Sequence, residues 1–248
     1  MQSLRSFGPA PLVAASVLAL AAPAFSADVD VSIVNFKFDP PVVSVKSGDT
    51  VTWTNNGASP HSSTSGKPED PNPGALWDSG LLTLGDTFTR TFQATDTSDY
   101  FCSVHPTMMF GKVYVNGTGV QGTMIPTNTT ITGGKIDLTV VLLNFTNGSQ
   151  STNVQVKVMT PGGQTKTVIN KDVAIGPNKQ LSRALTIMLP DGLPNGLYHV
   201  ILEVRDAGGN VVATDNDGYN KFVLGGGPAS LQGLRAESPN AAWHSDQN

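Results

Sequence analysis

Short runs in which apolar and polar residues alternate dominate the chain from residue 28 onward, and no long stretch shows helical periodicity. A period of two is typical of strands that bury one face. In the first part of the chain such runs lie within 28–38, 40–56, 87–94, 95–102 and 111–117. The first run is interrupted near Asn35, which predicts a bulge. About seven short strands separated by turns predict a β-sandwich.

A second group of alternating runs predicts another sandwich, immunoglobulin-like in pattern, over residues 133–224. Its predicted strands lie at 135–145, 153–159, 166–175, 181–189, 196–206 and 210–215. Residues 161–163 and 207–210 carry the glycines of hairpin turns. Residues 118–132 are rich in Gly, Thr and Pro and predict a linker. The final stretch, 225–248, has low hydrophobicity and no period, which predicts disorder. The expected fold class is therefore all-β.

The first 26 residues have the pattern of an export signal. Arg5 precedes an apolar run at 12–22 that is too short to be a stable membrane anchor, and small residues flank Phe25. We therefore predict that residues 1–26 are a cleaved signal peptide and that the protein acts in the periplasm, with secretion as the alternative. No later stretch is apolar enough to predict a membrane span.

Charge excludes one class of partner. Residues 27–117 contain ten acidic and five basic residues, and residues 118–224 contain seven acidic and eight basic residues. Neither half carries a basic patch, so we predict no nucleic-acid binding. We also find no set of residues typical of nucleophilic or acid–base catalysis, and the prediction is that the protein is not an enzyme.

Cys102 is the only cysteine in 248 residues. In an oxidising compartment a lone cysteine is a buried apolar residue, a reactive thiol, an intermolecular link or a metal ligand. His105 follows at a Cys-x-x-His spacing, His61 ends an upstream strand, and two methionines follow at 108 and 109. A thiolate, two imidazoles and a weak thioether are the ligands of a type 1 copper site. One such copper ion per chain is therefore the predicted cofactor.

The other two histidines fit no such set. His199 lies on the predicted solvated face of its strand, and His244 lies in the final stretch. Larger copper enzymes need further histidines for their additional metal centres, so we do not expect one here.

Several separated motifs resemble the plastocyanin and amicyanin branch of the cupredoxins. They are "SGDTVTWTNNGASPH", "WDSGLL", "GDTFTRTF", "DYFCSVHPTMM" and "GKVYV", in that order within residues 27–117. The resemblance implies a Greek-key β-sandwich with a copper site at one end. It also implies that His61, Cys102 and His105 are the equatorial copper ligands. Plastocyanins often have Asn after the first ligand, where this chain has Ser62, so the tie between the two ligand loops is expected to be weaker or differently routed.

Two methionines compete for the axial position. The spacing "CSVHPTM" matches an amicyanin-like loop and favours Met108. Counting back from "GKV" favours Met109, and the strand period places Met109 on one face with Gly111, Val113 and Val115. We favour Met109, with Met108 as the alternative.

The resemblance implies a carrier that moves single electrons by Cu(II)/Cu(I) cycling. Its partners would be transient redox proteins such as a cytochrome or a periplasmic oxidoreductase. The alternative is a copper-binding or copper-handling protein in which the second sandwich serves as a docking or structural module.

Overall fold

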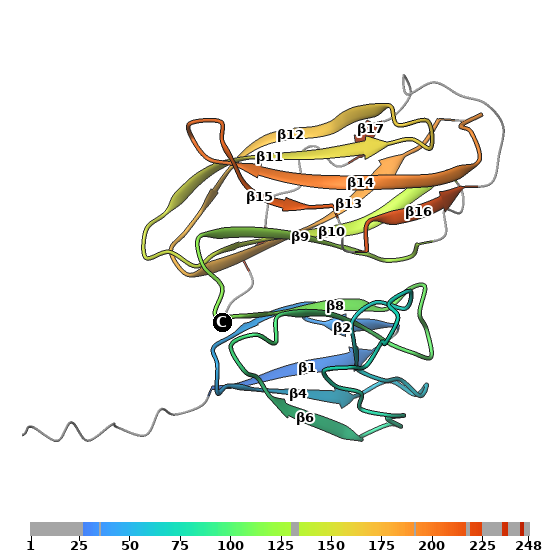
Figure 1. Ribbon diagram of the computed structural model, residues 1–248, viewed down its shortest axis with the longest axis vertical. Coiled ribbons are helices and arrows are strands. Elements are labelled where there is room, and N and C mark those ends of the chain that lie inside the picture. The colour runs from blue at the N-terminus through green and yellow to red at the C-terminus, as the bar shows by residue number, and fades with distance from the viewer. Residues whose placement is uncertain are drawn as a thin grey trace, which may run out of the picture.

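The chain forms two β-sandwiches (Figure 1) in a computed structural model that describes residues 27–34, 36–129, 134–190, 192–216, 219–224, 235–237 and 244–245. No helix occurs among these residues, so none of them could cross a membrane as one. The all-β prediction with two sandwiches is confirmed. The predicted signal peptide, residues 1–26, lies outside the described residues.

Two four-stranded sheets make the N-terminal sandwich. The first has the order β2-β1-β4-β6, and the second has the order β3-β8-β7-β5. β1 pairs with β4 in parallel, as does β3 with β8, and the other pairs are antiparallel. The strand bounds are β1 Asp28–Val34, β2 Lys37–Asp39, β3 Val42–Val45, β4 Thr50–Asn55, β5 Thr64–Ser65, β6 Thr87–Thr91, β7 Ser98–Phe101 and β8 Phe110–Val115.

The chain reverses between β1 and β2 instead of continuing as one bulged strand, so the predicted bulge is wrong; Asn35 itself lies outside the described residues. Val34 pairs with Lys37 and Ile33 with Phe38, so β1 and β2 form a tight hairpin. Phe36 adopts a left-handed backbone with φ 62° in this turn. The alternating apolar residues shift by one position, from Val29, Val31 and Ile33 to Phe36 and Phe38. A bulge gives the same shift, which is why the sequence pattern resembled one bulged strand.

Aromatic side chains fill the core of the N-terminal sandwich. The ring of Trp53 on β4 lies 5.8 Å from that of Trp77 and 5.6 Å from that of Tyr100, centroid to centroid. Gly111 on β8 has room for no side chain, because a Cβ there would lie 2.2 Å from the Tyr100 ring. The core thus packs tightly up to the strand ends that precede Cys102.

The C-terminal sandwich consists of two larger sheets. One has the order β17-β13-β10-β9, with β18 also paired to β13, and the other has the order β12-β11-β14-β15, with β16 also paired to β14. Buried apolar residues alternate with partly buried ones along β11 and β14, as the sequence predicts. The strand bounds are β9 Val120–Pro126, β10 Lys135–Asn144, β11 Gln150–Met159, β12 Thr165–Ile175, β13 Lys179–Met188, β14 Gly196–Arg205, β15 Val211–Asp215, β16 Lys221–Leu224, β17 Arg235–Glu237 and β18 His244–Ser245.

The interval 118–132, interpreted from composition as a linker, contains strand β9. β9 pairs with β10, and its Val120 and Met124 lie in the core of the C-terminal sandwich. The buried carboxylate of Asp215 accepts hydrogen bonds from the Met124 backbone N–H at 2.7 Å and from Thr123 Oγ1 at 2.9 Å. Long-range bonds of this kind, which composition does not reveal, make this segment a strand.

Part of the stretch predicted to be disordered also pairs with the sheet. Residues 235–237 and 244–245 form β17 and β18 against β13, and the rest of 225–248 lies outside the described residues. β17 and β18 pair with the backbone N–H and C=O groups along the edge of β13. Backbone pairing of this kind does not require apolar side chains, so low hydrophobicity did not exclude it.

An apolar interface joins the two sandwiches. The outer face of the β3-β8-β7-β5 sheet packs against β9, β10 and Tyr219. The rings of Phe110 and Tyr219 lie 4.3 Å apart, centroid to centroid. Both faces of β8 are therefore covered, and its burial is nearly continuous. The residues of this cluster are Val42, Phe101, Phe110, Tyr114, Ile125, Val141, Leu143 and Tyr219.

Candidate metal centre

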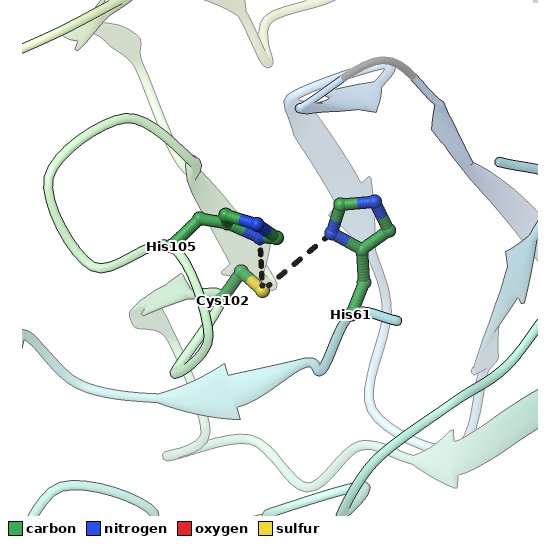
Figure 2. Close-up of side chains that lie close together, drawn as sticks. All are labelled: His61, Cys102 and His105. Atoms are coloured by element: carbon green, nitrogen blue, oxygen red, sulfur yellow. Dashed lines mark hydrogen bonds between the residues drawn. The ribbon is translucent and has the colours of Figure 1, made fainter. Parts of the chain in front are cut away.

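The side chains of His61, Cys102 and His105 converge at one end of the N-terminal sandwich. Figure 2 shows both imidazole rings turned toward the Cys102 sulfur. Cys102 Sγ lies 3.8 Å from His61 Nδ1 and 3.5 Å from His105 Nδ1. The possible ligand atoms of the three residues all lie within 4.8 Å of one another. Within the described residues, this is the one such cluster of three that could hold a metal ion.

His61 is fixed by backbone pairing with Leu82. The His61 N–H donates to the Leu82 carbonyl at 3.0 Å, and the Leu82 N–H donates to the His61 carbonyl at 2.8 Å. The buried amide of Asn55 spans the preceding turn, since its Nδ2 donates to the carbonyls of Ser59 and Leu82, each at 2.9 Å. The first histidine therefore lies in an isolated β-bridge at the close of the loop that follows β4, and not at the end of the upstream strand itself.

Cys102 and His105 lie on a compact loop between β7 and β8. The His105 N–H donates to the Cys102 carbonyl at 3.0 Å, and the N–H groups of Met108 and Met109 donate to the His105 carbonyl at 3.2 and 3.3 Å. The Cys102 N–H donates to the Met109 carbonyl at 3.1 Å. This last bond continues the β7–β8 ladder by one residue, because Phe101 pairs with Phe110.

The two methionines differ in orientation and burial. Residues opposite each other in antiparallel strands lie on the same face, so Met109 shares the inner face with Cys102. Met109 is fully buried in the core cluster that contains Cys102. Met108 is only partly buried and lines a cavity of about 270 Å³ between the sandwiches. Met109 is therefore the methionine that shares the core with Cys102.

Ser62 ties the two ligand loops together. Its backbone N–H donates to Cys102 Sγ at 3.3 Å, and its side-chain Oγ accepts a hydrogen bond from the Ser103 N–H at 2.8 Å. The Oγ atoms of Ser62 and Ser103 lie 2.9 Å apart, and Ser62 Oγ also contacts Thr64 Oγ1 at 3.0 Å. The Ser62 hydroxyl thus links the two ligand loops by its hydrogen bond with the backbone N–H of Ser103, the residue after Cys102.

The surroundings of His61 favour its neutral form. Burial lowers the pKa of the His61 imidazole, and the proximity of His105 lowers it further. A neutral imidazole keeps the lone pair that a metal ion needs, so protons compete less for this site.

The cluster fits a first-row transition metal. A nitrogen about 2.05 Å and a sulfur about 2.3 Å from one ion, at a trigonal angle, lie about 3.8 Å apart. The two observed sulfur–nitrogen distances, 3.5 and 3.8 Å, are close to that value. The set of one thiolate and two imidazoles suits copper, and its pairing with a thioether is typical of a type 1 site.

Phe36 is a feature of the site that the sequence pattern did not single out. Its side chain is 45% exposed, and its ring meets the rings of His105 and His61 edge-on at centroid distances of 4.8 and 5.9 Å. The reversal between β1 and β2 brings Phe36 next to the two histidines. The sequence pattern predicted one continuous strand, so it did not predict this contact. Val104 is also exposed, at 44%, on the loop that carries His105.

The remaining histidines lie elsewhere. His199 is on β14 in the C-terminal sandwich, paired with Lys221 and only partly buried, and His244 is in β18. Neither belongs to the cluster.

Comparisons with known proteins find similarity over the N-terminal part of the chain. The family described as copper binding proteins, plastocyanin/azurin family, matches residues 25–116. Amicyanin-alpha from Methylorubrum extorquens is 35% identical over 115 residues, which cover 46% of this chain and 92% of that protein. The chloroplastic plastocyanin of Tetradesmus obliquus is 36% identical over 108 residues, which cover 42% of this chain and 74% of that protein. The crystal structure of amicyanin from Paracoccus versutus matches with 32% sequence identity and a TM-score of 0.31. The matched region covers 38% of this chain and 85% of the amicyanin chain.

Proposed function

Because the chain belongs to the plastocyanin/azurin family of copper-binding proteins, we propose that it carries single electrons between redox partners while one bound copper ion alternates between Cu(II) and Cu(I). One observation carries the proposal. A fully buried cysteine sulfur faces two imidazole nitrogens at 3.5 and 3.8 Å, on loops fixed by backbone hydrogen bonds.

In this proposal His61, Cys102 and His105 would hold the copper ion, with Met109 as a fourth, weaker ligand. The first three meet in space, and Met109 lies opposite Cys102 on the same face of the β7–β8 ladder. Met108 is the alternative axial residue, and its partial burial beside the cavity between the sandwiches argues against it. Copper, when bound, supplies a one-electron couple.

The protein's own contribution is rigidity and the exclusion of water. The Ser62 N–H donates to Cys102 Sγ, and the burial of Cys102 keeps solvent from the sulfur. Ligand loops fixed by backbone hydrogen bonds would keep nearly one arrangement in both oxidation states of a bound copper ion. Electron transfer then requires little rearrangement of the protein.

The route to a partner is the partly exposed edge of His105. Exposed Phe36 and Val104 and the neighbouring Pro106 surround it and form an apolar contact surface. A transient partner such as a cytochrome or a periplasmic oxidoreductase would dock there. The ten acidic and five basic residues of 27–117 would speed the approach of a basic partner. A periplasmic location is supported by the signal-like pattern of residues 1–26.

The visible spectrum of the mature protein loaded with Cu(II), followed by a redox titration, tests the proposal. We expect an intense thiolate-to-copper band that ascorbate abolishes and ferricyanide restores. A colourless protein would refute the copper site as assigned. A band that disappears within minutes when a copper chelator is added would instead favour the copper-handling function.

A further inference from the structure

The ligand loop, residues 102–109, is held from two sides. Three of its internal bonds end on the carbonyls of Cys102 and His105, within the loop itself. The carbonyl of Thr107, midway between His105 and Met109, accepts its hydrogen bonds from the C-terminal sandwich instead. Thr129 donates to it twice, from the backbone N–H at 3.0 Å and from Oγ1 at 3.3 Å.

Thr129 is itself anchored. It follows β9, and its carbonyl accepts a hydrogen bond from the Val223 N–H of β16 at 3.2 Å. Residue 129 therefore lies between the ligand loop and a strand of the C-terminal sandwich. A displacement of that sandwich would move the Thr107 carbonyl with it.

A second contact reaches the segment that follows His61. The buried Tyr219 hydroxyl donates to the Gly66 carbonyl at 2.7 Å, while its ring packs on Phe110 next to Met109. Gly66 directly follows β5, and its N–H donates to the Asp99 carbonyl at 2.7 Å. The C-terminal sandwich thus contacts the ligand loop itself at Thr107, the segment after His61 at Gly66, and β8, which begins after Met109.

We propose that the C-terminal sandwich is a clamp that positions the ligands of the metal centre, with Thr129 and Tyr219 as its positioning residues. The inference rests on the proposed copper site. In this proposal the C-terminal sandwich is more than a spacer, because contacts from it determine how His105 and Met109 are arranged.

The test compares Thr129→Pro, which removes the backbone donor, with Thr129→Ala, which keeps it. Tyr219→Phe removes only the hydroxyl bond to Gly66. Gln180→Ala is the matched control, since Gln180 Nε2 makes a bond between the sandwiches that ends on the Val42 carbonyl at 3.2 Å, on β3 and outside the ligand loops.

Two readouts are needed, one of them independent of copper. Amide hydrogen exchange of the copper-free, full-length protein should become faster across residues 103–109 in Thr129→Pro and across the segment around Gly66 in Tyr219→Phe. In the copper-loaded protein, the reduction potential and the thiolate band should shift in Thr129→Pro. Copper release to a chelator should be about fivefold faster, the factor that corresponds to the loss of one ordinary hydrogen bond. Gln180→Ala should match the unmodified protein in every readout.

The outcomes separate the two proposals. A folded Thr129→Pro protein with unchanged exchange over 103–109 and an unchanged potential would overturn the clamp. If Thr129→Pro does not fold, the Tyr219→Phe variant provides the test. Unchanged amide hydrogen exchange around Gly66 in that variant would overturn the clamp. A colourless unmodified protein would refute the copper site, while the exchange measurements on the copper-free protein would still test the clamp.

Discussion

Replacing Met109 with leucine should change the electronic properties of the site without unfolding the protein. Met109 is fully buried, and it lies opposite Cys102 across the β7–β8 ladder. Leucine has nearly the same volume, so the free energy of unfolding should fall by about 1.5 kcal/mol or less. The matched control is Met108→Leu, which changes the neighbouring and only partly buried thioether.

The expected shift in reduction potential follows from the loss of one weak donor. A thioether donates electron density to the more highly charged Cu(II), and leucine leaves that side of the ion apolar, so the potential should rise. If the thioether stabilises Cu(II) over Cu(I) by about 1.4 kcal/mol, the rise for a one-electron couple is about 59 mV. In Met108→Leu the potential should stay at its original value.

The assay is a spectroscopic redox titration of both variants, with thermal unfolding of the same samples as the check on folding. A shift confined to Met109→Leu would establish Met109 as the axial ligand. An equal or larger shift in Met108→Leu would refute the argument from strand register. No shift in either variant would mean that neither thioether contacts the copper.

Three further outcomes are expected. Ser62→Ala removes the hydroxyl that links the two ligand loops, so copper release to a chelator should be about fivefold faster, the equivalent of one hydrogen bond. Gly111→Ala forces a methyl group into the ring of Tyr100, and urea titration should show a loss of about 1–3 kcal/mol. Glu203 accepts a hydrogen bond from Lys157 at 2.5 Å, which lowers the pKa of its carboxyl group. The contribution of this ion pair to the free energy of unfolding is present above the pKa of Glu203 in the unfolded chain. It is lost as the pH falls through the lowered pKa of Glu203 in the folded protein. Glu203→Gln should therefore cost roughly 0.5 kcal/mol at pH 7, and unfolding curves of the two proteins should converge in acid.

Local pattern was enough to predict both sandwiches, and it singled out three side chains, His61, Cys102 and His105, that the structure brings together. Period-two alternation identifies strands such as β4 and β14 directly, and the spacing from Cys102 to His105 places two ligands on one short loop. The preference for Met109 over Met108 as a copper ligand rests on the same strand period and stays a prediction.

Features that depend on distant partners could not be predicted. Strand β9 exists because β10 and the carboxylate of Asp215 pair with its backbone, although its composition resembles a linker. The position of Phe36 beside the histidines depends on the reversal between β1 and β2, and local alternation does not distinguish that reversal from a bulge. The bonds from Thr129 and Tyr219 to the ligand region join residues 22 and 153 positions apart, and no motif marks them.

The apolar outer face of the β3-β8-β7-β5 sheet makes the copper-binding half dependent on its neighbour for solubility. A chain cut after residue 117 would leave Phe101, Phe110 and Tyr114 facing water, on a sheet whose other face is already the core of that half. Exposed apolar strand surfaces of this kind aggregate. We therefore expect the isolated first half to precipitate or self-associate. Fusion of the two sandwiches would then be difficult to reverse by gene fission, because the shared face would first have to become polar.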